Sequence, residues 1–554
     1  MTSRTEPETL SFLAPLRYRH YRRIWTASVM SNLGQTVQAV GAAWTMTQLT
    51  SSADLVALVQ AAAMLPLMLI ALPAGAIADM YDRRRVAMSA LALAFTAAAG
   101  LAAVTYLGLL TPWVLLGFCF LIGGGMALYT PSWAASASEQ VPDEVLPSAV
   151  ALNSISFNIA RSFGPALGGL LVAAAGAAAT FVANAALYLP LLVALSLWKR
   201  KVEPPRLPPE QLGRAVVSGV RYFIHTPPVR VVALRGMLTS FFVAAIYALL
   251  PLIARDLLKG GAGTYGVLLG CFGMGAVGGA LSVAHLRRLG DDERSIRVAT
   301  AIMGAAVLVL ALSRVVAITS AAMMAAGAMW MVITTSFNIG MQFSAPRWVT
   351  GRALAGFQAS IAAGMAAGAW AWGAVADIHS VPIALLCASA GLLLTPFAGR
   401  WLPMPTVSGP NTLAAEPAEP DVRLAVTARS GPVVIEILYE VELSEARAFY
   451  TAMQELQRVR RRNGGHDWSL ARDIAEPRLW TERFYCPTWL DYLRMRARMT
   501  ETERECQQRV YAFHAGPDPI RVTRKLERPF GSVRWREDSP TPSAEILPIT
   551  PSAT

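Results

Sequence analysis

The chain has 554 residues, of which 54% are hydrophobic and 15% are charged, and its mean hydropathy is +0.43. Soluble domains carry roughly a quarter charged residues, so this composition excludes an ordinary soluble globular protein. The formal net charge is +12. The arginines cluster beside hydrophobic runs and in the C-terminal region, without a nucleic-acid motif, so we expect no nucleic-acid partner.

Two hydrophobic blocks occupy residues 24–198 and 231–402, and each contains apolar runs long enough to cross a bilayer as helices. This pattern predicts an all-α membrane protein with twelve transmembrane helices in two six-helix bundles. We place the first six spans near residues 24–49, 54–78, 86–108, 113–137, 147–174 and 178–198. We place the second six near residues 231–254, 263–285, 296–314, 317–343, 353–376 and 381–402.

Basic residues lie mainly on one side of these expected spans, for example at residues 83–85 and at Arg287 and Arg288. The opposite side carries Arg255, Lys259 and Arg314. The positive-inside rule then places both termini and the central loop in the cytoplasm. Residues 1–23, the cytoplasmic N-terminus, lack the apolar core of a cleavable signal peptide, so the first span is expected to act as an uncleaved signal.

The remaining segments are polar. Residues 199–230 read as a cytoplasmic linker with an amphipathic helix near 211–225 that lies at the membrane surface and tethers the two halves. Residues 403–425 form a flexible linker and residues 531–554 a disordered tail.

Between these last two segments, residues 426–530 show the order β-α-β-β-α-β, with a helix expected from Ser444, a candidate N-cap. This order predicts a small α+β ferredoxin-like cytoplasmic domain. It resembles the dimeric α/β-barrel proteins that include antibiotic-biosynthesis monooxygenases. A homodimer through this domain is therefore an expected partner interaction.

A charged loop follows the second span, where residues 75–85 read Gly-Ala-Ile-Ala-Asp-Met-Tyr-Asp-Arg-Arg-Arg. An aspartate at a helix end can pair with arginines and brace neighbouring helices, and breaking that network would favour opening toward the cytoplasm. The loop resembles the loop-2/3 signature of the major facilitator superfamily, with Met80 in place of a basic residue and Asp82 in place of glycine. Positive-inside topology alone would explain the arginines. We predict a gating role for Asp79, Asp82, Arg83 and Arg84.

The fifth span contains Gly164-Pro165-Ala-Leu-Gly168-Gly169. Proline removes a helix hydrogen bond and the glycines permit close helix contact, so a kink or a tight crossing is expected here. The segment resembles the GPxxGG motif of the superfamily's exporters, although Ala160 replaces an upstream glycine. That resemblance implies a gating role for the four residues and an outward direction of transport.

Arg161 is the full charge that we place nearest the middle of the membrane, and Asn158 lies three residues earlier on the same helical face. A buried arginine is costly unless it is paired or faces water, so we predict that Arg161 lines a cavity and meets an anionic group of a substrate. The alternative is a structural arginine held by helix carbonyls and by amides such as Asn184 or Gln35. Further substrate-binding candidates are Gln35, Gln38, Asn338 and Gln342, each of which could instead form a helix–helix hydrogen bond.

The sequence contains no signal for a cofactor. Its five cysteines form no CxxC pair, so neither a zinc site nor a disulfide framework is expected. A Walker-type phosphate loop is also missing, which disfavours ATP-driven transport. No Asp or Glu lies clearly at mid-membrane, and coupling to protons is implied by the family resemblance, with Asp79 and Glu139 as the candidate groups.

The motifs and the two-block topology, over about residues 10–405, resemble the bacterial secretion-effector branch of the major facilitator superfamily, which includes enterobactin-exporter-like proteins. The resemblance implies a proton antiporter, not an enzyme, that exports a small molecule such as a drug, siderophore or secondary metabolite by alternating access. Two alternatives remain at this point. One is a membrane-anchored ferredoxin-like monooxygenase-type enzyme, and the other is a transporter-like receptor.

Overall fold

The computed structural model describes residues 13–136, 139–142, 145–198, 212–289, 292–346, 349–405, 422–424 and 426–527. The start of the chain, much of both expected linkers and the C-terminal tail predicted at 531–554 lie outside these residues. The chain separates into two compact units. The helical unit comprises residues 1–216, 228–341 and 352–405, and the tail unit comprises residues 217–227, 342–351 and 406–554.

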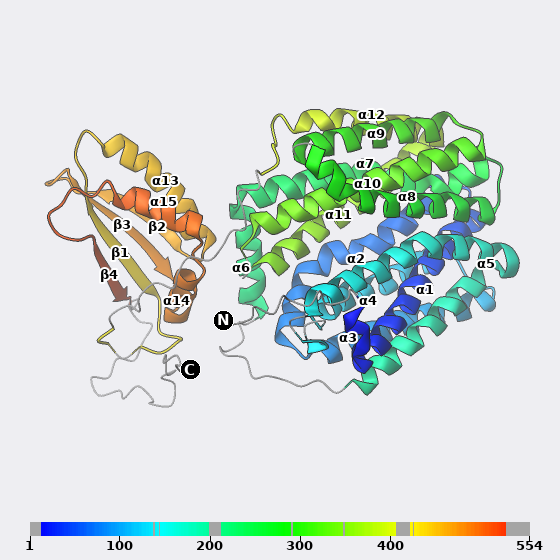
Figure 1. The fold of residues 1–554 in the computed structure, drawn as a ribbon, viewed down its shortest axis with the longest axis horizontal. Helices are drawn as coiled ribbons and strands as arrows, with labels where there is room; N and C mark the ends of the chain where they lie inside the picture. Colours follow the sequence, from blue (N-terminus) through cyan, green and yellow to red (C-terminus); the bar gives the residue numbers. More distant parts are fainter. Residues whose placement is uncertain are drawn as a thin grey trace, which may run out of the picture. The chain divides into compact units, whose positions relative to one another are not determined.

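The described helices in the first half of the helical unit (Figure 1) are α1 (Arg19–Leu49), α2 (Ala53–Met80), α3 (Arg83–Tyr106), α4 (Pro112–Ser136) and α5 (Leu146–Leu197). Local capping sets two of the starts. The Ser52 hydroxyl accepts from the backbone N–H of Leu55 at α2, and the Asp82 carboxylate accepts from Arg85 N–H at α3.

Helix α5 has 52 residues, and an unbroken helix of that length would measure about 78 Å, far more than a bilayer needs. Gly176 divides it, because its φ of +78° leaves the helical region. A positive φ costs glycine little, since it has no side chain. The break falls between the two spans expected at residues 147–174 and 178–198.

The second half contains six helices, namely α7 (Pro227–Leu252), α8 (Ala262–Leu289), α9 (Asp292–Leu312), α10 (Val316–Ser344), α11 (Thr350–Ile378) and α12 (Val381–Ala398). A π-helical turn, η4 (Ile253–Leu257), extends α7 just after Pro251. Among the described residues, nine helices are long and apolar enough to cross a membrane. Helix α5 is one of the nine in spite of its break, whereas α1 is not among them and α12 is a shorter apolar helix. The unit is therefore mostly helical and built for a bilayer.

The tail unit holds an antiparallel sheet of four strands in the order β2-β3-β1-β4. Its elements are β1 (Val433–Glu440), α13 (Ala446–Arg462), β2 (His466–Arg472), β3 (Leu479–Cys486), α14 (Trp489–Ala497), α15 (Glu501–Tyr511) and β4 (Arg521–Leu526). The helices cover one face of the sheet (Figure 1). The N-cap of α13 is Glu445, whose side chain makes no capping bond, so the prediction of a Ser444 cap was wrong.

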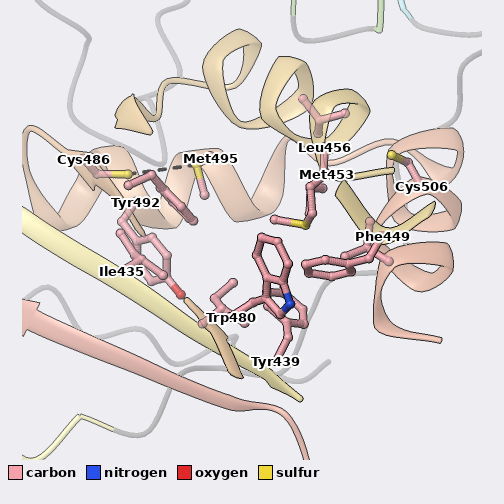
Figure 2. Close-up of a cluster of buried hydrophobic side chains, with 14 of the residues drawn as sticks. Ile435, Tyr439, Phe449, Met453, Leu456, Trp480, Cys486, Tyr492, Met495 and Cys506 are labelled. Carbon is pink, nitrogen blue, oxygen red and sulfur yellow. Dashed lines mark hydrogen bonds between the residues drawn. The ribbon is translucent and has the colours of Figure 1, made fainter. Parts of the chain in front are cut away.

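The core of the tail unit lies between that sheet face and the helices. Alternate residues of β1 point into it, as the strand period requires, and they meet aromatic residues of α13 and β3. Figure 2 shows Tyr439, Phe449 and Trp480 packed together in this core, with Phe449 at 5.4 Å from Tyr439 and 5.5 Å from Trp480 between ring centres. The tail unit therefore has its own hydrophobic core.

The end of α6 (Leu212–His225) belongs to the tail unit. The Tyr222 hydroxyl donates to Ser344 O at 3.2 Å, and Arg221 Nη1 donates to Gly464 O at 3.4 Å. The guanidinium of Arg462 lies 5.9 Å from the centre of the Tyr222 ring. These contacts join α6 to the α13–β2 turn and to the end of α10.

Candidate functional site

Arg161 of α5 lies where the two halves of the helical unit meet. Its Nη2 donates to the Tyr247 hydroxyl of α7 at 2.8 Å, and its guanidinium carbon lies 5.7 Å from the centre of the Phe272 ring of α8. The Tyr247 and Phe272 rings pack edge to face at 5.3 Å. Within the described part of the chain, Arg161 forms no ion pair. Its charge is therefore solvated by a hydroxyl and an aromatic face from the opposite half.

Close packing of α5 against α8 holds this arginine in place. Pro165 has no N–H to bond the Arg161 carbonyl one turn earlier. A Cβ at Gly273 of α8 would lie 2.6 Å from that carbonyl oxygen, so only glycine fits there. The Ser162 hydroxyl donates to Gly273 O at 3.2 Å. Proline and glycine thus allow two backbones from opposite halves to touch.

The GPxxGG residues pack α5 on two sides. A Cβ at Gly164 would overlap Thr36, and one at Gly168 would lie 3.0 Å from the Val40 Cβ, so both face α1. Gly169 faces α8 instead, where a Cβ would lie 2.6 Å from the Gly266 Cα. The motif therefore contacts both a neighbour in its own half and the other half.

The remaining polar candidates do not gather into one cluster. Asn158 and Gln35 are half-buried. Gln38 is buried and accepts from the Asn184 amide, which is a helix–helix hydrogen bond within the first half. Asn338 donates to Thr334 O of its own helix at 2.8 Å, and Gln342 is exposed and belongs to the tail unit.

The charged loop between α2 and α3 braces the first half. The Asp79 side chain lies outside the described residues, and Asp82 caps α3. Arg83 Nη1 pairs with Glu139 Oε1 at 2.9 Å. Arg84 Nε donates to Leu195 O at 2.8 Å, at the end of α5. The two arginines thus connect the start of α3 to the segment after α4 and to the last turn of α5.

The described residues contain no group of three or more His, Cys, Asp or Glu side chains that could hold a metal ion. The candidate site consists of the Arg161 guanidinium, the Tyr247 hydroxyl and the Phe272 ring, where the two halves meet. Such a set can bind an anionic or polar organic molecule through hydrogen bonds and ring contacts.

Comparison with known proteins identifies the family. Residues 10–530 match the family described as transmembrane secretion effector. The chain belongs to this family. Secretion effectors are membrane transporters of the major facilitator superfamily, which agrees with the helical unit described above.

Several curated relatives are similar to this secretion effector. The multidrug efflux pump Tap of Mycolicibacterium fortuitum is 25% identical over 390 residues, which are 68% of this chain and 94% of Tap. The staphyloferrin A transporter of Staphylococcus aureus is 25% identical over 48% of this chain and 66% of its own length. The enterobactin exporter EntS of Shigella boydii is 30% identical over 39% of this chain and 52% of EntS.

Solved structures share the fold at low sequence identity. The nucleoside transporter NupG has a TM-score of 0.54 and 11% identity, and the match covers 69% of this chain and 98% of NupG. A bacterial homologue of the human lysosomal transporter Spinster has a TM-score of 0.55 and 13% identity over 70% of this chain and 97% of its own. The helical unit therefore has the fold of these transporters.

The sequence did not reveal the contacts between the two halves of this secretion effector at the loop between α1 and α2. We call this end of the helical unit the α1–α2 end. The Asp377 carboxylate of α11 accepts from Ala53 N–H at 2.8 Å, and Arg255 Nη1 donates to Thr47 O at 2.7 Å. Each is a side chain of the second half that caps a helix end of the first. Arg255, Thr47 and Asp377 lie far apart in sequence, so no local pattern could reveal the pairing.

A second missed feature is an ion pair inside the second half. Arg235 is 4% exposed, and its Nη1 lies 2.5 Å from Glu293 Oε2 while its Nη2 lies 3.1 Å from Oε1. Arg235 also donates to Leu402 O at 3.2 Å. The sequence offered one signal of this ion pair, because Arg235 lies four positions inside the span expected at residues 231–254. The pair ties α7 and α9 to the segment that follows α12.

Proposed function

We propose that this protein exports a small organic molecule with an anionic group, by alternating access of the two helical halves around Arg161. The observation that carries the proposal is the contact of Arg161 with Tyr247 and Phe272, because it places a cation without an ion-pair partner among the described residues between the halves. A charge at such a place marks a substrate pathway. Transporters with paired halves bind substrate at the repeat interface.

The substrate class rests on the relatives. Their names assign them staphyloferrin A, enterobactin and multiple drugs, and we extend small-molecule export to this chain. Asn158, one turn before Arg161, and Gln35 of α1 are half-buried, which suits groups that could hydrogen-bond a substrate. Gln38, Asn338 and Gln342 are less well placed, given the contacts described above.

We also infer the arrangement in the membrane. Division of α5 at Gly176, together with α1 and α12, supports twelve spans in two sets of six. The arginine distribution supports cytoplasmic termini in a bacterial inner membrane. The strand order of the tail unit supports a ferredoxin-like domain that could form a homodimer.

In this orientation the α1–α2 end faces away from the cytoplasm. The cross-half contacts of Asp377 and Arg255 then close the outer gate, and opening must break them. On the cytoplasmic side, Asp79, Asp82, Arg83 and Arg84 would steady the first half during this motion. Proton coupling through Asp79 or Glu139 extends the family resemblance to this chain.

Export of charged fluorophores tests the proposal. Cells that make the protein are loaded with carboxyfluorescein or with ethidium, and the loss of each dye is followed with and without an uncoupler. We expect faster loss of the anionic dye than in cells without the protein. Arg161→Ala should slow that loss at least tenfold, because it removes a charge-assisted hydrogen bond.

Two controls make the test specific. Arg314→Ala removes an arginine whose hydrogen bonds, among the described residues, go to carbonyls near its own helix end at Ala311 and Ser313, and export should persist. Arg161→Lys, which keeps the charge, should retain more export than Arg161→Ala. Equal export by wild type and Arg161→Ala would contradict the assigned role of Arg161, and uncoupler-resistant export would contradict proton coupling.

A further inference from the structure

A cavity of about 360 Å³ lies in the tail unit, between the sheet and helices α14 and α15. Its floor is apolar and comes from three strands, through Ile435 and Ile437 of β1, Phe484 of β3 and Val522 of β4. This volume is in the range of small-molecule sites, which are mostly apolar with a few placed polar groups. We call this cavity the arginine pocket, for the residues described next.

Two arginines of the pocket occupy positions that point toward the core. Arg524 lies opposite Ile435 in the β1–β4 register, between Val522 and Leu526 on the same face. Arg460 follows Phe449, Met453 and Leu456 along the buried face of α13, and it is 4% exposed. Burial of a charge opposes folding. Sequence rules are broken in this way mainly at functional sites.

Two guanidiniums flank one aromatic ring of the pocket. The guanidinium carbons of Arg524 and Arg496 lie 5.8 Å and 5.9 Å from the centre of the Tyr492 ring. Arg524 Nε also donates to the Tyr492 hydroxyl at 2.7 Å. Arg504 lines the same cavity, and none of the described residues that line the cavity is acidic. Neighbouring cations repel one another, so an anion among them would be stabilised.

The buried Arg460 has a different role. Its Nε bonds Glu482 Oε1 at 3.1 Å, which compensates its charge, and its Nη1 donates to Gln507 Oε1 at 3.1 Å. Arg460 is therefore a positioning residue that orients Gln507 toward the cavity. Contact with an anion falls to Arg524, which lines the cavity beside Tyr492.

We propose that the arginine pocket binds an organic anion with an apolar body, such as an aromatic carboxylate. The apolar floor would take the ring system, and the Arg524 guanidinium would hold the carboxylate through charge-assisted hydrogen bonds. This site is separate from Arg161 and would give the transporter a second, regulatory binding site in its tail unit. It stands whether or not the protein exports anions.

Calorimetry on the purified full-length protein tests the proposal, with 2-naphthoate as the probe and 2-naphthamide as its neutral counterpart. Heats of titration into protein-free micelles are subtracted. We expect naphthoate to bind at least tenfold more tightly than the amide. Arg524→Gln should weaken naphthoate binding about tenfold or more, since it removes one charged donor.

Three variants show whether naphthoate binds in this pocket. Arg521→Gln changes an arginine of the same strand that lies opposite Leu438, on the other face of the sheet, and binding should be unchanged. Arg161→Ala removes the anion contact of the proposed transport site, so the binding that remains in this variant reports on the tail unit and should still be weakened by adding Arg524→Gln. Val522→Phe keeps every charge but fills the apolar floor of the cavity, so it should abolish naphthoate binding. Cys486 should stay protected from alkylation in this variant, which shows that the tail unit is still folded. Equal affinity for the acid and the amide, or unchanged binding by Arg524→Gln, would overturn the proposal, as would loss of binding by Arg161→Ala.

Discussion

At the scale of single residues, Glu482 shows how the tail unit accommodates buried charge. Its side chain is fully buried, and its carboxylate accepts from Arg460 Nε at 3.1 Å, Tyr439 Oη at 2.9 Å and Trp468 Nε1 at 3.0 Å. A buried ion pair adds little stability compared with apolar packing, but removal of one partner strands the other charge. The pair therefore restricts which substitutions the core tolerates.

Removal of this carboxylate should unfold the tail readily. Glu482→Ala leaves Arg460 buried without its counter-ion and should cost about 3–5 kcal/mol. Cys486 provides the readout, because burial raises the pKa of its thiol to about 12 and leaves it protonated near neutral pH. Only opening of the domain frees the thiolate for alkylation. We expect alkylation of Cys486, followed by mass spectrometry, to be at least a hundred times faster in the variant.

The matched control is an exposed ion pair in the same domain. Glu455 bonds Arg509 at 3.1 Å, with both side chains more than half exposed. Glu455→Ala should change the alkylation rate by less than about fivefold, since exposed pairs contribute at most about 1 kcal/mol. Similar rates for the two variants would show that burial of Glu482 does not matter.

At the scale of elements, one glycine contact sets the distance between α5 and α8. A Cβ at Gly266 would lie 2.7 Å from the Gly169 Cα, which is closer than real Cβ contacts come. Small residues permit such approach in membranes, where apolar burial alone does not drive helix association. The two halves are thus in direct backbone contact at this crossing.

An added methyl group should therefore separate the helices. We expect Gly266→Ala to destabilise the purified protein by about 1–3 kcal/mol through overpacking, measured as a lower thermal midpoint, and to slow export. Gly278→Ala is the matched control on α8, because nothing lies within 4 Å of its Cβ. Alanine is also a better helix former than glycine, so this control should keep or raise stability. A harmless Gly266→Ala would mean that the contact does not constrain the interface.

At the scale of the whole molecule, the closed α1–α2 end depends on helix ends that are capped from the opposite half. Arg255 is placed near the negative C-terminus of α1, through Thr47 O, and Asp377 near the positive N-terminus of α2, through Ala53 N–H. Both signs agree with the helix dipole. Asp256 holds the same Arg255 guanidinium through two bonds, at 2.7 and 3.0 Å. Closure of this end is therefore electrostatic as well as steric.

Loss of a cap should shift the conformational equilibrium toward opening at this end. Arg255→Ala or Asp377→Ala should each cost the closed state about 1 kcal/mol, or roughly a fivefold change in population. Spin labels at exposed positions 51 and 379, in a cysteine-depleted background, report the separation. Longer distances should gain weight in both variants. Arg314→Ala, which removes no described contact between the halves, should give the wild-type distance distribution. An unchanged distance distribution in Arg255→Ala and Asp377→Ala would show that these two contacts do not hold the end closed.

Much of the architecture could be predicted from local pattern. Apolar runs and the glycine-proline segment at 164–169 predicted helices and a close crossing. The pattern β-α-β-β-α-β predicted the order of strands and helices in the tail unit, where the second helical step is divided into α14 and α15. The family was recognised from the same motifs. The candidate site was predicted in part. Arg161 could be singled out because a charge among apolar residues is conspicuous, and its role in binding stays a prediction. Amides such as Gln38 have the same sequence pattern in a helix–helix bond as in a binding site.

What the amino-acid sequence determined by itself was the membrane class, the helical segments and the order of elements in the tail, because hydrophobic periodicity acts within one segment. Tertiary structure alone decided the partners. It brought Tyr247 and Phe272 to Arg161, and Arg255 and Asp377 to helix ends in the other half. It also turned Arg524 inward beside Tyr492. These contacts join residues tens to hundreds of positions apart, and no local spacing encodes which of them will meet.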